Sequence, residues 1–154
     1  KKGRQFEKLR AINSTGSPLP LDAYAWVYDN VKNDLWLASI SGGTDIASGF
    51  VACAPILPVN AGEIQCRELG VAAHAFNEQG QKVVAEVGEL VITEPMPSMP
   101  VFFWNDESGA RYHDSYFDVF AGYWRHGDWI QIGTGAAAGC VDRAGLHADH
   151  VENW

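Results

Sequence analysis

The sequence contains few cysteines and no long apolar run, and both shortages narrow the class of protein. Cys53, Cys66 and Cys140 are odd in number, widely spaced and without a CxxC pair. Because disulfide-stapled domains need an even, closely spaced set, we expect thiols and a reducing, cytoplasmic setting. No apolar stretch approaches the ~18 residues that a membrane-spanning helix needs, and no signal-peptide pattern is present.

Positive charge is also scarce. Eleven Lys and Arg residues stand against nineteen Asp and Glu residues, which gives a formal net charge of −8. Apart from the N-terminal KKGR, no basic cluster offsets this charge, so we expect neither nucleic acid nor an anionic membrane as a partner. A small anion can still bind at exposed backbone amides, and the net charge therefore leaves a nucleotide open as a ligand.

Signatures of several enzyme classes are missing. The sequence has no HExxH, no cysteine spacing typical of zinc sites, no GxSxG elbow and no Walker loop with its lysine. These absences argue against a structural metal and against a serine hydrolase. The histidines form no metal-ligand pattern; they are His74, His113, His126, His147 and His150.

The composition is typical of a globular protein, and the chain begins with a strand–helix–strand pattern. Hydrophobic residues make up 47% and charged residues 19% of a length that suits one domain. Residues 8–20 predict a short strand, a turn and a helix start, residues 21–32 a helix, and residues 34–41 a buried strand. Short connections between such elements are typical of a βαβ unit with parallel strands.

After residue 52 the pattern changes to short strands separated by turns. We expect strands within 62–76, 81–88 and 88–94, with a hairpin turn over 77–81. The prolines of 94–100 predict an extended loop. The remaining expectations are a turn and a short helix in 106–120, a turn flanked by strand in 123–132, a small and flexible segment over 133–140, and weak helical character over 141–154.

The segment SGGTD, residues 41–45, is the first candidate site. Gly42 and Gly43 follow an apolar run and leave backbone N–H groups available to phosphate oxygens. Thr44 adds a hydroxyl donor, and Asp45 adds a carboxylate for a divalent cation. Open α/β sheets bind ligands at this end of a parallel strand. A tight turn with Thr44 or Asp45 as a helix N-cap also explains these residues, and both interpretations stay open.

Two other short segments are candidates. Gly16, Ser17 and Pro18 follow the first strand and can present backbone to a flat ring, or they form a plain strand-to-helix loop. Asp128 in HGDW can accept hydrogen bonds from ribose hydroxyls, or it is an exposed turn residue. His126 in the same turn can carry a proton, although a lone histidine is more often structural.

Four segments occur in a fixed order that is specific as a combination. STGSPLP, SGGTD, GELVITEPMPSMPVFFWND and WRHGDW resemble the adenylate-forming acyl-CoA synthetases, and the proline-rich run is closest to the branch that activates acetoacetate. The resemblance covers about residues 8–132. It implies an AMP-forming acid–CoA ligase that uses ATP, Mg²⁺ and coenzyme A. In that reaction a carboxylate attacks the α-phosphate, acyl-AMP and pyrophosphate form, and the CoA thiol displaces AMP. The implied partners are a nucleotide and a short-chain carboxylic acid.

The resemblance also implies roles for individual residues. Thr44 would contact the phosphate of ATP or of the acyl-adenylate, and Asp45, in place of the usual Glu, would help to hold Mg²⁺; these two form the catalytic set. Asp128 would bind the ribose hydroxyls. Gly42 stands where acetate-activating relatives have a bulky aromatic residue, and would leave room for a longer acyl group. The whole nucleotide-binding set is Gly16, Ser17, Pro18 (against the adenine), Ser41, Gly42, Gly43, Thr44 and Asp128.

The implied fold is α/β and β-rich, as part of a ligase domain. Residues 1–52 would be the end of a nucleotide-binding α/β subdomain with a parallel βαβ layer. Residues 53–132 would be a twisted, barrel-like β-rich subdomain with the ribose-binding turn, and residues 133–154 a divergent C-terminal tail.

Parts of the family pattern are absent from this sequence, which also starts without methionine. These parts are the upstream phosphate loop, the hinge, and the C-terminal domain with its adenylation lysine. We expect a piece of a longer protein that is inactive as a ligase alone, with exposed faces and hence marginal stability or self-association. Beyond Ile132 only Gly139, Cys140 and Val141 match the sequence pattern of the family, which suggests truncation or a changed reading frame. If no reading frame in the downstream DNA encodes the hinge, the hypothesis of a changed reading frame is contradicted.

Two alternative functions stay open at this stage. One is a non-catalytic, stand-alone binding or assembly module of ligase ancestry. The other is a ligase fragment for another short acid, such as propionate or butyrate.

Overall fold

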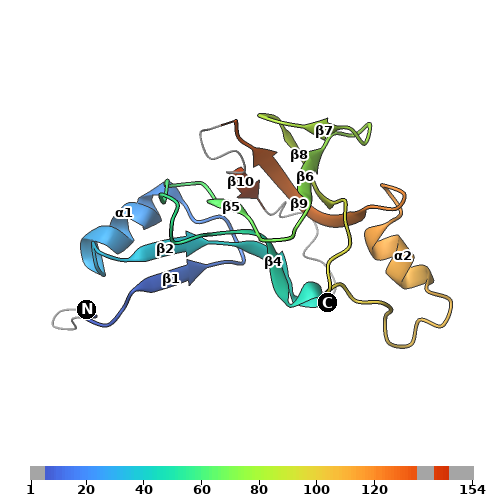
Figure 1. Ribbon diagram of the computed structural model, residues 1–154, viewed down its shortest axis with the longest axis horizontal. Helices are drawn as coiled ribbons and strands as arrows, with labels where there is room; N and C mark the ends of the chain where they lie inside the picture. The colour runs from blue at the N-terminus through green and yellow to red at the C-terminus, as the bar shows by residue number, and fades with distance from the viewer. Residues whose placement is uncertain (1–5, 135–140, 146–154) are drawn as a thin grey trace.

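The N-terminal part of the chain forms two paired parallel strands, and a helix connects the first strand to the second (Figure 1). In the computed structural model, which describes residues 6–134 and 141–145, β1 is Ala11–Ser14, α1 is Leu21–Asn30 and β2 is Trp36–Ser39. The predicted strand, helix and strand all form, and β1 pairs with β2 along its full length. The helix ends at its tenth residue, slightly before the predicted end.

The glycine pair belongs to a strand rather than following one. After β2 the backbone leaves the parallel pair at Ile40 and enters a second, antiparallel sheet of order β3-β4-β5. The strand predicted over 34–41 therefore forms only over Trp36–Ser39, because Ser41 already belongs to the next sheet. The elements of the second sheet are β3 (Ser41–Gly43), the 3-10 turn η1 (Thr44–Ile46), β4 (Ser48–Ala52) and β5 (Cys66–Arg67).

The third sheet is β-rich, as the turn pattern after residue 52 predicts. Its five strands follow the order β10-β9-β8-β6-β7, and each neighbouring pair is antiparallel. Asn77 closes the predicted hairpin, because its side-chain oxygen accepts the backbone N–H groups of Gln79 and Gln81. The strands are β6 (Ala73–Phe76), β7 (Lys82–Val83), β8 (Val87–Ile92), β9 (Trp124–Ile132) and β10 (Val141–Gly145).

Two expectations about this part of the chain are not met. The barrel-like description is not confirmed, since β7 and β10 are the two edges of an open sheet within the described residues. The weak helical character expected over 141–154 is wrong for Val141–Gly145, where pairing with β9 produces a strand. Tertiary pairing of this kind overrides local propensity. The rest of that segment and residues 135–140 lie outside the described residues.

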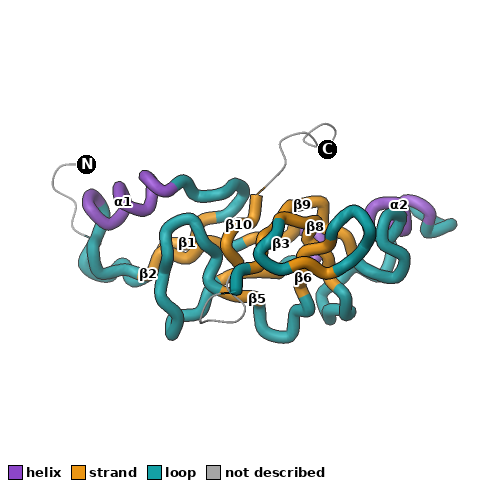
Figure 2. Tube along the Cα trace, turned by 90° about the horizontal axis from the view of Figure 1, so that it is seen from above, coloured by secondary structure: helices purple, strands orange, loops and turns teal. Residues whose placement is uncertain are grey.

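A second helix, α2 (Ala110–Tyr116), forms within the segment predicted to contain a short helix. It lies at the opposite end of the molecule from α1 in both views (Figure 1, Figure 2). Its residues pack beside Trp124 at the start of β9. The main core is formed by side chains of α2 and of the two antiparallel sheets. It includes Phe50, Leu90, Ile92 and Ile130, all almost fully buried.

Several large apolar side chains face solvent. Ile56, Leu69, Val101 and Trp104 are 90%, 99%, 81% and 79% exposed. They agree with the expectation of exposed faces, while self-association stays a prediction. Within residues 6–134 and 141–145, no helix has the length and apolar character needed to cross a bilayer.

Candidate functional site

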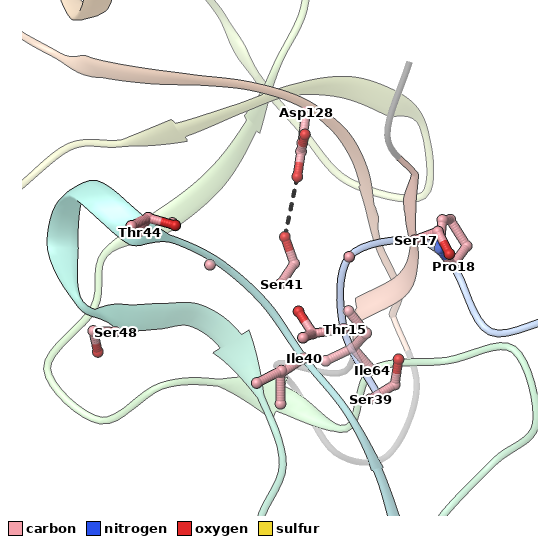
Figure 3. Close-up of a pocket in the computed structure, with 13 residues that line it drawn as sticks. Thr15, Ser17, Pro18, Ser39, Ile40, Ser41, Thr44, Ser48, Ile64 and Asp128 are labelled. Atoms are coloured by element: carbon pink, nitrogen blue, oxygen red, sulfur yellow. Dashed lines mark hydrogen bonds between the residues drawn. The ribbon is translucent and has the colours of Figure 1, made fainter. Parts of the chain in front are cut away.

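All predicted site residues except Asp45 line one cavity of about 440 Å³ at the carboxyl ends of β1 and β2 (Figure 3). The loop after β1 forms one wall, β3 and the first residue of η1 form another, and β9 contributes from a different sheet. This is the position at which parallel strands in open α/β sheets bind ligands. The predicted residues that line the cavity are Gly16, Ser17, Pro18, Ser41, Gly42, Gly43, Thr44 and Asp128.

Asp128 projects into the cavity from an irregular part of β9. Glu89 and Val91 of β8 pair with Trp129 and Arg125, so two steps along β8 oppose four steps along β9. The extra residues form a bulge around Gly127, whose φ of +99° favours glycine. The turn predicted over 123–132 is therefore a bulge within one continuous strand, because β8 pairs on both sides of it.

The Asp128 carboxylate is held by neighbours from two directions. Ser41 Oγ donates to its Oδ2 over 3.2 Å, across 87 residues of sequence (Figure 3). His126 Nε2 lies 3.3 Å from the same oxygen, close enough for an ion pair when the imidazole is protonated. The two side chains of that pair are only 17% and 13% exposed. Both contacts fall on Oδ2; within the described part of the chain, Oδ1 is the oxygen that can accept hydrogen bonds from a ligand.

The loop at residues 15–18 presents an open edge to the cavity. Gly16 has a φ of +88°, and no atom of the described residues, apart from its two chain neighbours, lies within 4 Å of the point where its Cβ would be. Ser17 and Pro18 lie across the cavity from Thr44 (Figure 3). A flat ring could approach this backbone without meeting a side chain at Gly16. Thr15, Ser39 and Ser48 also line the cavity; sequence reasoning missed them, because an isolated hydroxyl residue carries no local signal.

Gly42 is explained by strand packing rather than by room for a ligand. A Cβ at this position would lie 2.2 Å from the carbonyl oxygen of Ser48 and 2.7 Å from Gly49 Cα. The space that the glycine leaves is thus filled by the backbone of β4. This corrects the expectation that Gly42 opens the cavity to a longer acyl group. At Gly43, by contrast, a Cβ would meet its nearest neighbour, His126 Cε1, at an ordinary 3.5 Å.

Thr44 and Asp45 have different surroundings. Thr44 is exposed and lines the cavity, whereas Asp45 does not line it. The Tyr116 hydroxyl donates a hydrogen bond to Asp45 Oδ2. Burial, and then the neighbouring Asp45, raise the pKa of Tyr116, so the phenol stays protonated as a donor at neutral pH. The sequence contains no motif that connects Tyr116 to Asp45, which lies 71 residues away.

Asp45 can serve as one ligand of a Mg²⁺ ion whose other ligands come from a nucleotide and water. The described residues do not form a metal site by themselves. Among residues 6–134 and 141–145, no group of three or more His, Cys, Asp or Glu side chains could hold an ion. Asp45 offers one oxygen beyond the one that Tyr116 contacts. Mg²⁺ is commonly bound by one or two carboxylates together with substrate phosphates and water, and a single carboxylate beside Thr44 agrees with that mode.

Comparison with known proteins gives consistent relatives. The chain is 49% identical over 127 residues to acetoacetyl-CoA synthetase of Gallus gallus, covering 82% of this chain and 19% of that protein. It is 52% identical over 126 residues to acetoacetyl-coenzyme A synthetase of Rhizobium meliloti (strain 1021), with the same coverage of 82% and 19%. Among solved structures, acetoacetyl-CoA synthetase from Streptomyces lividans matches with a TM-score of 0.76 at 49% identity, over 86% of this chain and 20% of that one. No family model matches. The chain thus spans about a fifth of the length of these relatives.

Proposed function

Because the chain belongs to the acetoacetyl-CoA synthetase family and corresponds to one segment of its members, we propose that it forms part of the nucleotide site of an AMP-forming acid–CoA ligase. One observation carries this proposal. Eight residues that the family resemblance assigns to nucleotide binding come from separate parts of the chain, and all of them line a single cavity.

In the proposed complex, each wall of the cavity binds one part of the nucleotide. Gly16, Ser17 and Pro18 lie against the adenine, since their loop offers backbone without a side chain at Gly16. Asp128 accepts hydrogen bonds from the ribose hydroxyls through Oδ1. Thr44 donates to the phosphate, aided by backbone N–H groups of β3. Ser41 supports Asp128 through its hydroxyl.

The proposed chemistry joins a carboxylic acid to coenzyme A in two steps. The acid attacks the α-phosphorus of ATP, pyrophosphate leaves, and the CoA thiol then displaces AMP from the acyl-adenylate. A Mg²⁺ ion bound with the nucleotide would offset phosphate charge, with Asp45 as one protein ligand. The residues of this chain bind and orient the nucleotide. We propose that the complete reaction needs the remaining length of a family member, and that acetoacetate is the acid, as the names of the relatives indicate.

Nucleotide titration of the 154-residue chain tests the proposal directly. We expect AMP and Mg-ATP to change the tryptophan fluorescence saturably, because the chain contains six tryptophans and two of them, Trp124 and Trp129, lie on the strand that carries Asp128. Inosine monophosphate, with the ribose and phosphate unchanged, is a control for the adenine contact. A response to neither AMP nor Mg-ATP would contradict a nucleotide site in this chain.

A chimera tests the acid. The matching segment of the Streptomyces lividans acetoacetyl-CoA synthetase would be replaced by this chain, and pyrophosphate release would be measured with acetoacetate, propionate and butyrate. We expect release that depends on acetoacetate. Faster release with propionate or butyrate would assign another short acid.

An assembly module of ligase ancestry is the second candidate function. It is favoured by the exposed apolar side chains Ile56, Leu69, Val101 and Trp104. A defined oligomer in light scattering, together with no response to nucleotide, would support this function over the first.

A further inference from the structure

Tyr116 reaches from α2 to the turn that precedes β4. Its hydroxyl donates to Oδ2 of Asp45, the middle residue of η1, across 71 residues of sequence. Tyr116 is 7% exposed as a residue, whereas Asp45 is exposed. The contact therefore joins a fixed, largely buried donor to an acceptor on the surface.

The Tyr116 ring is fixed by its aromatic neighbours. It stacks on Trp124 with centroids 3.6 Å apart and planes 16° apart. Phe103 and Tyr112 each contact it edge-on, with centroids 5.6 Å away. Trp124 is itself 2% exposed and belongs to β9. The hydroxyl thus sits at a point set by α2, β9 and the loop before α2.

The turn η1 connects β3 to β4, whose residues Gly43 and Ser48 pair on either side of it; within the described residues, few other contacts constrain it. It contains three residues, begins after Gly43 without a side-chain cap, and ends at Ala47, whose φ of +47° is rare for alanine. One backbone hydrogen bond closes it, from Ala47 N–H to the carbonyl oxygen of Thr44 over 3.1 Å. Ile46 anchors one side of the turn in the core at 1% exposure. The hydrogen bond from Tyr116 anchors Asp45, next to Thr44.

We propose that Tyr116 is a positioning residue for the phosphate-contacting turn: through Asp45 it fixes η1 and so holds Thr44 at the cavity. This inference rests on the proposed function, in which Thr44 contacts the phosphate. A turn fixed before the ligand arrives loses less conformational freedom on binding, and that difference appears as affinity. Loss of the Tyr116 hydroxyl must therefore weaken the binding of a ligand that carries a phosphate, and not the binding of the nucleoside alone.

The test compares AMP with adenosine on two matched variants of the 154-residue chain, in EDTA so that no metal contributes. Tyr116→Phe keeps the ring and removes the hydroxyl. Tyr112→Phe is the control, because it lies on the same helix and loses an equivalent hydrogen bond, to the carbonyl oxygen of Pro100 at 2.7 Å. We expect Tyr116→Phe to weaken AMP binding about tenfold and adenosine binding less than about twofold, the former equal to about 1.4 kcal/mol. Tyr112→Phe should leave the ratio of the AMP affinity to the adenosine affinity unchanged.

Asp45→Ala extends the test to the partner residue. It should weaken AMP binding in EDTA as much as Tyr116→Phe does, and the double variant should be no weaker than either single one. Additive losses would overturn the inference, since the two groups would then act separately.

Hydrogen exchange gives a measurement that needs no nucleotide. The Ala47 amide should exchange about threefold faster or more in Tyr116→Phe, and at the wild-type rate in Tyr112→Phe. AMP binding that Tyr116→Phe leaves intact, or weakens equally for adenosine, overturns the inference while the proposed function stands. A wild-type chain that binds no AMP contradicts the proposed function instead, and an unchanged Ala47 rate then overturns the positioning role as well.

Discussion

Replacing Asp128 by alanine is expected to weaken AMP binding to the chain by about 100-fold or more. In the proposed complex the carboxylate accepts hydrogen bonds from two ribose hydroxyls, and bonds to a charged acceptor contribute about 1.5–3 kcal/mol each. Loss of both therefore exceeds about 3 kcal/mol, which corresponds to more than about two orders of magnitude in Kd. The substitution also removes the acceptor of the Ser41 hydroxyl. Fluorescence titration with AMP measures the effect.

The controls separate the ribose contact from general damage to the fold. Asp114→Ala removes an aspartate whose side chain is 75% exposed on α2, and it should bind AMP as the wild type does. The affinity for 2′,3′-dideoxy-AMP, which lacks both hydroxyls, should be nearly the same in Asp128→Ala and in the wild type. Equal losses for AMP and the dideoxy compound, at an unchanged melting temperature, would contradict the ribose role.

The sequence predicts the N-terminal half of the site well because the signals there are local. Helical spacing of apolar residues identifies α1, and an apolar run bounded by turn residues identifies β2. The position of Gly16 to Pro18 at the end of β1 follows from that order of elements. Asp128 is a candidate from the HGDW segment and again from the family resemblance, and the structure brings its carboxylate to the same cavity.

What the sequence does not predict depends on contacts between distant segments. The bulge that turns Asp128 toward Ser41 arises from pairing of β9 with β8, and 87 residues separate the two side chains. The bond between Tyr116 and Asp45 spans 71 residues. Val141–Gly145 becomes a strand only because β9 offers an edge. No local periodicity encodes such partners.

Gly42 illustrates the same limit, because two explanations of one glycine are indistinguishable in sequence. A family comparison reads it as a missing aromatic side chain and predicts space. The structure places β4 backbone in that space, 2.2 Å from the Cβ position. Real Cβ atoms do not approach a carbonyl oxygen so closely, and a carbonyl in a paired strand cannot rotate away as a side chain does.

Gly42→Ala is therefore expected to destabilise the fold by about 3 kcal/mol or more, the upper range for overpacking. The β3–β4 pair must separate locally, which disturbs the register in which Gly42 lies opposite Gly49. Gly43→Ala is the matched control in the same strand, since its new methyl group would meet His126 at an ordinary 3.5 Å and its φ of −137° suits alanine. It should change the free energy of unfolding by less than about 1 kcal/mol.

Urea unfolding of the two alanine variants measures the difference. Equal stability would contradict the strand-packing explanation and return Gly42 to the role of a space for ligand. The outcome also bears on acid choice. If the backbone of β4 makes glycine obligatory at residue 42, then the acid choice that we propose for this site must depend on side chains other than the one that Gly42 lacks.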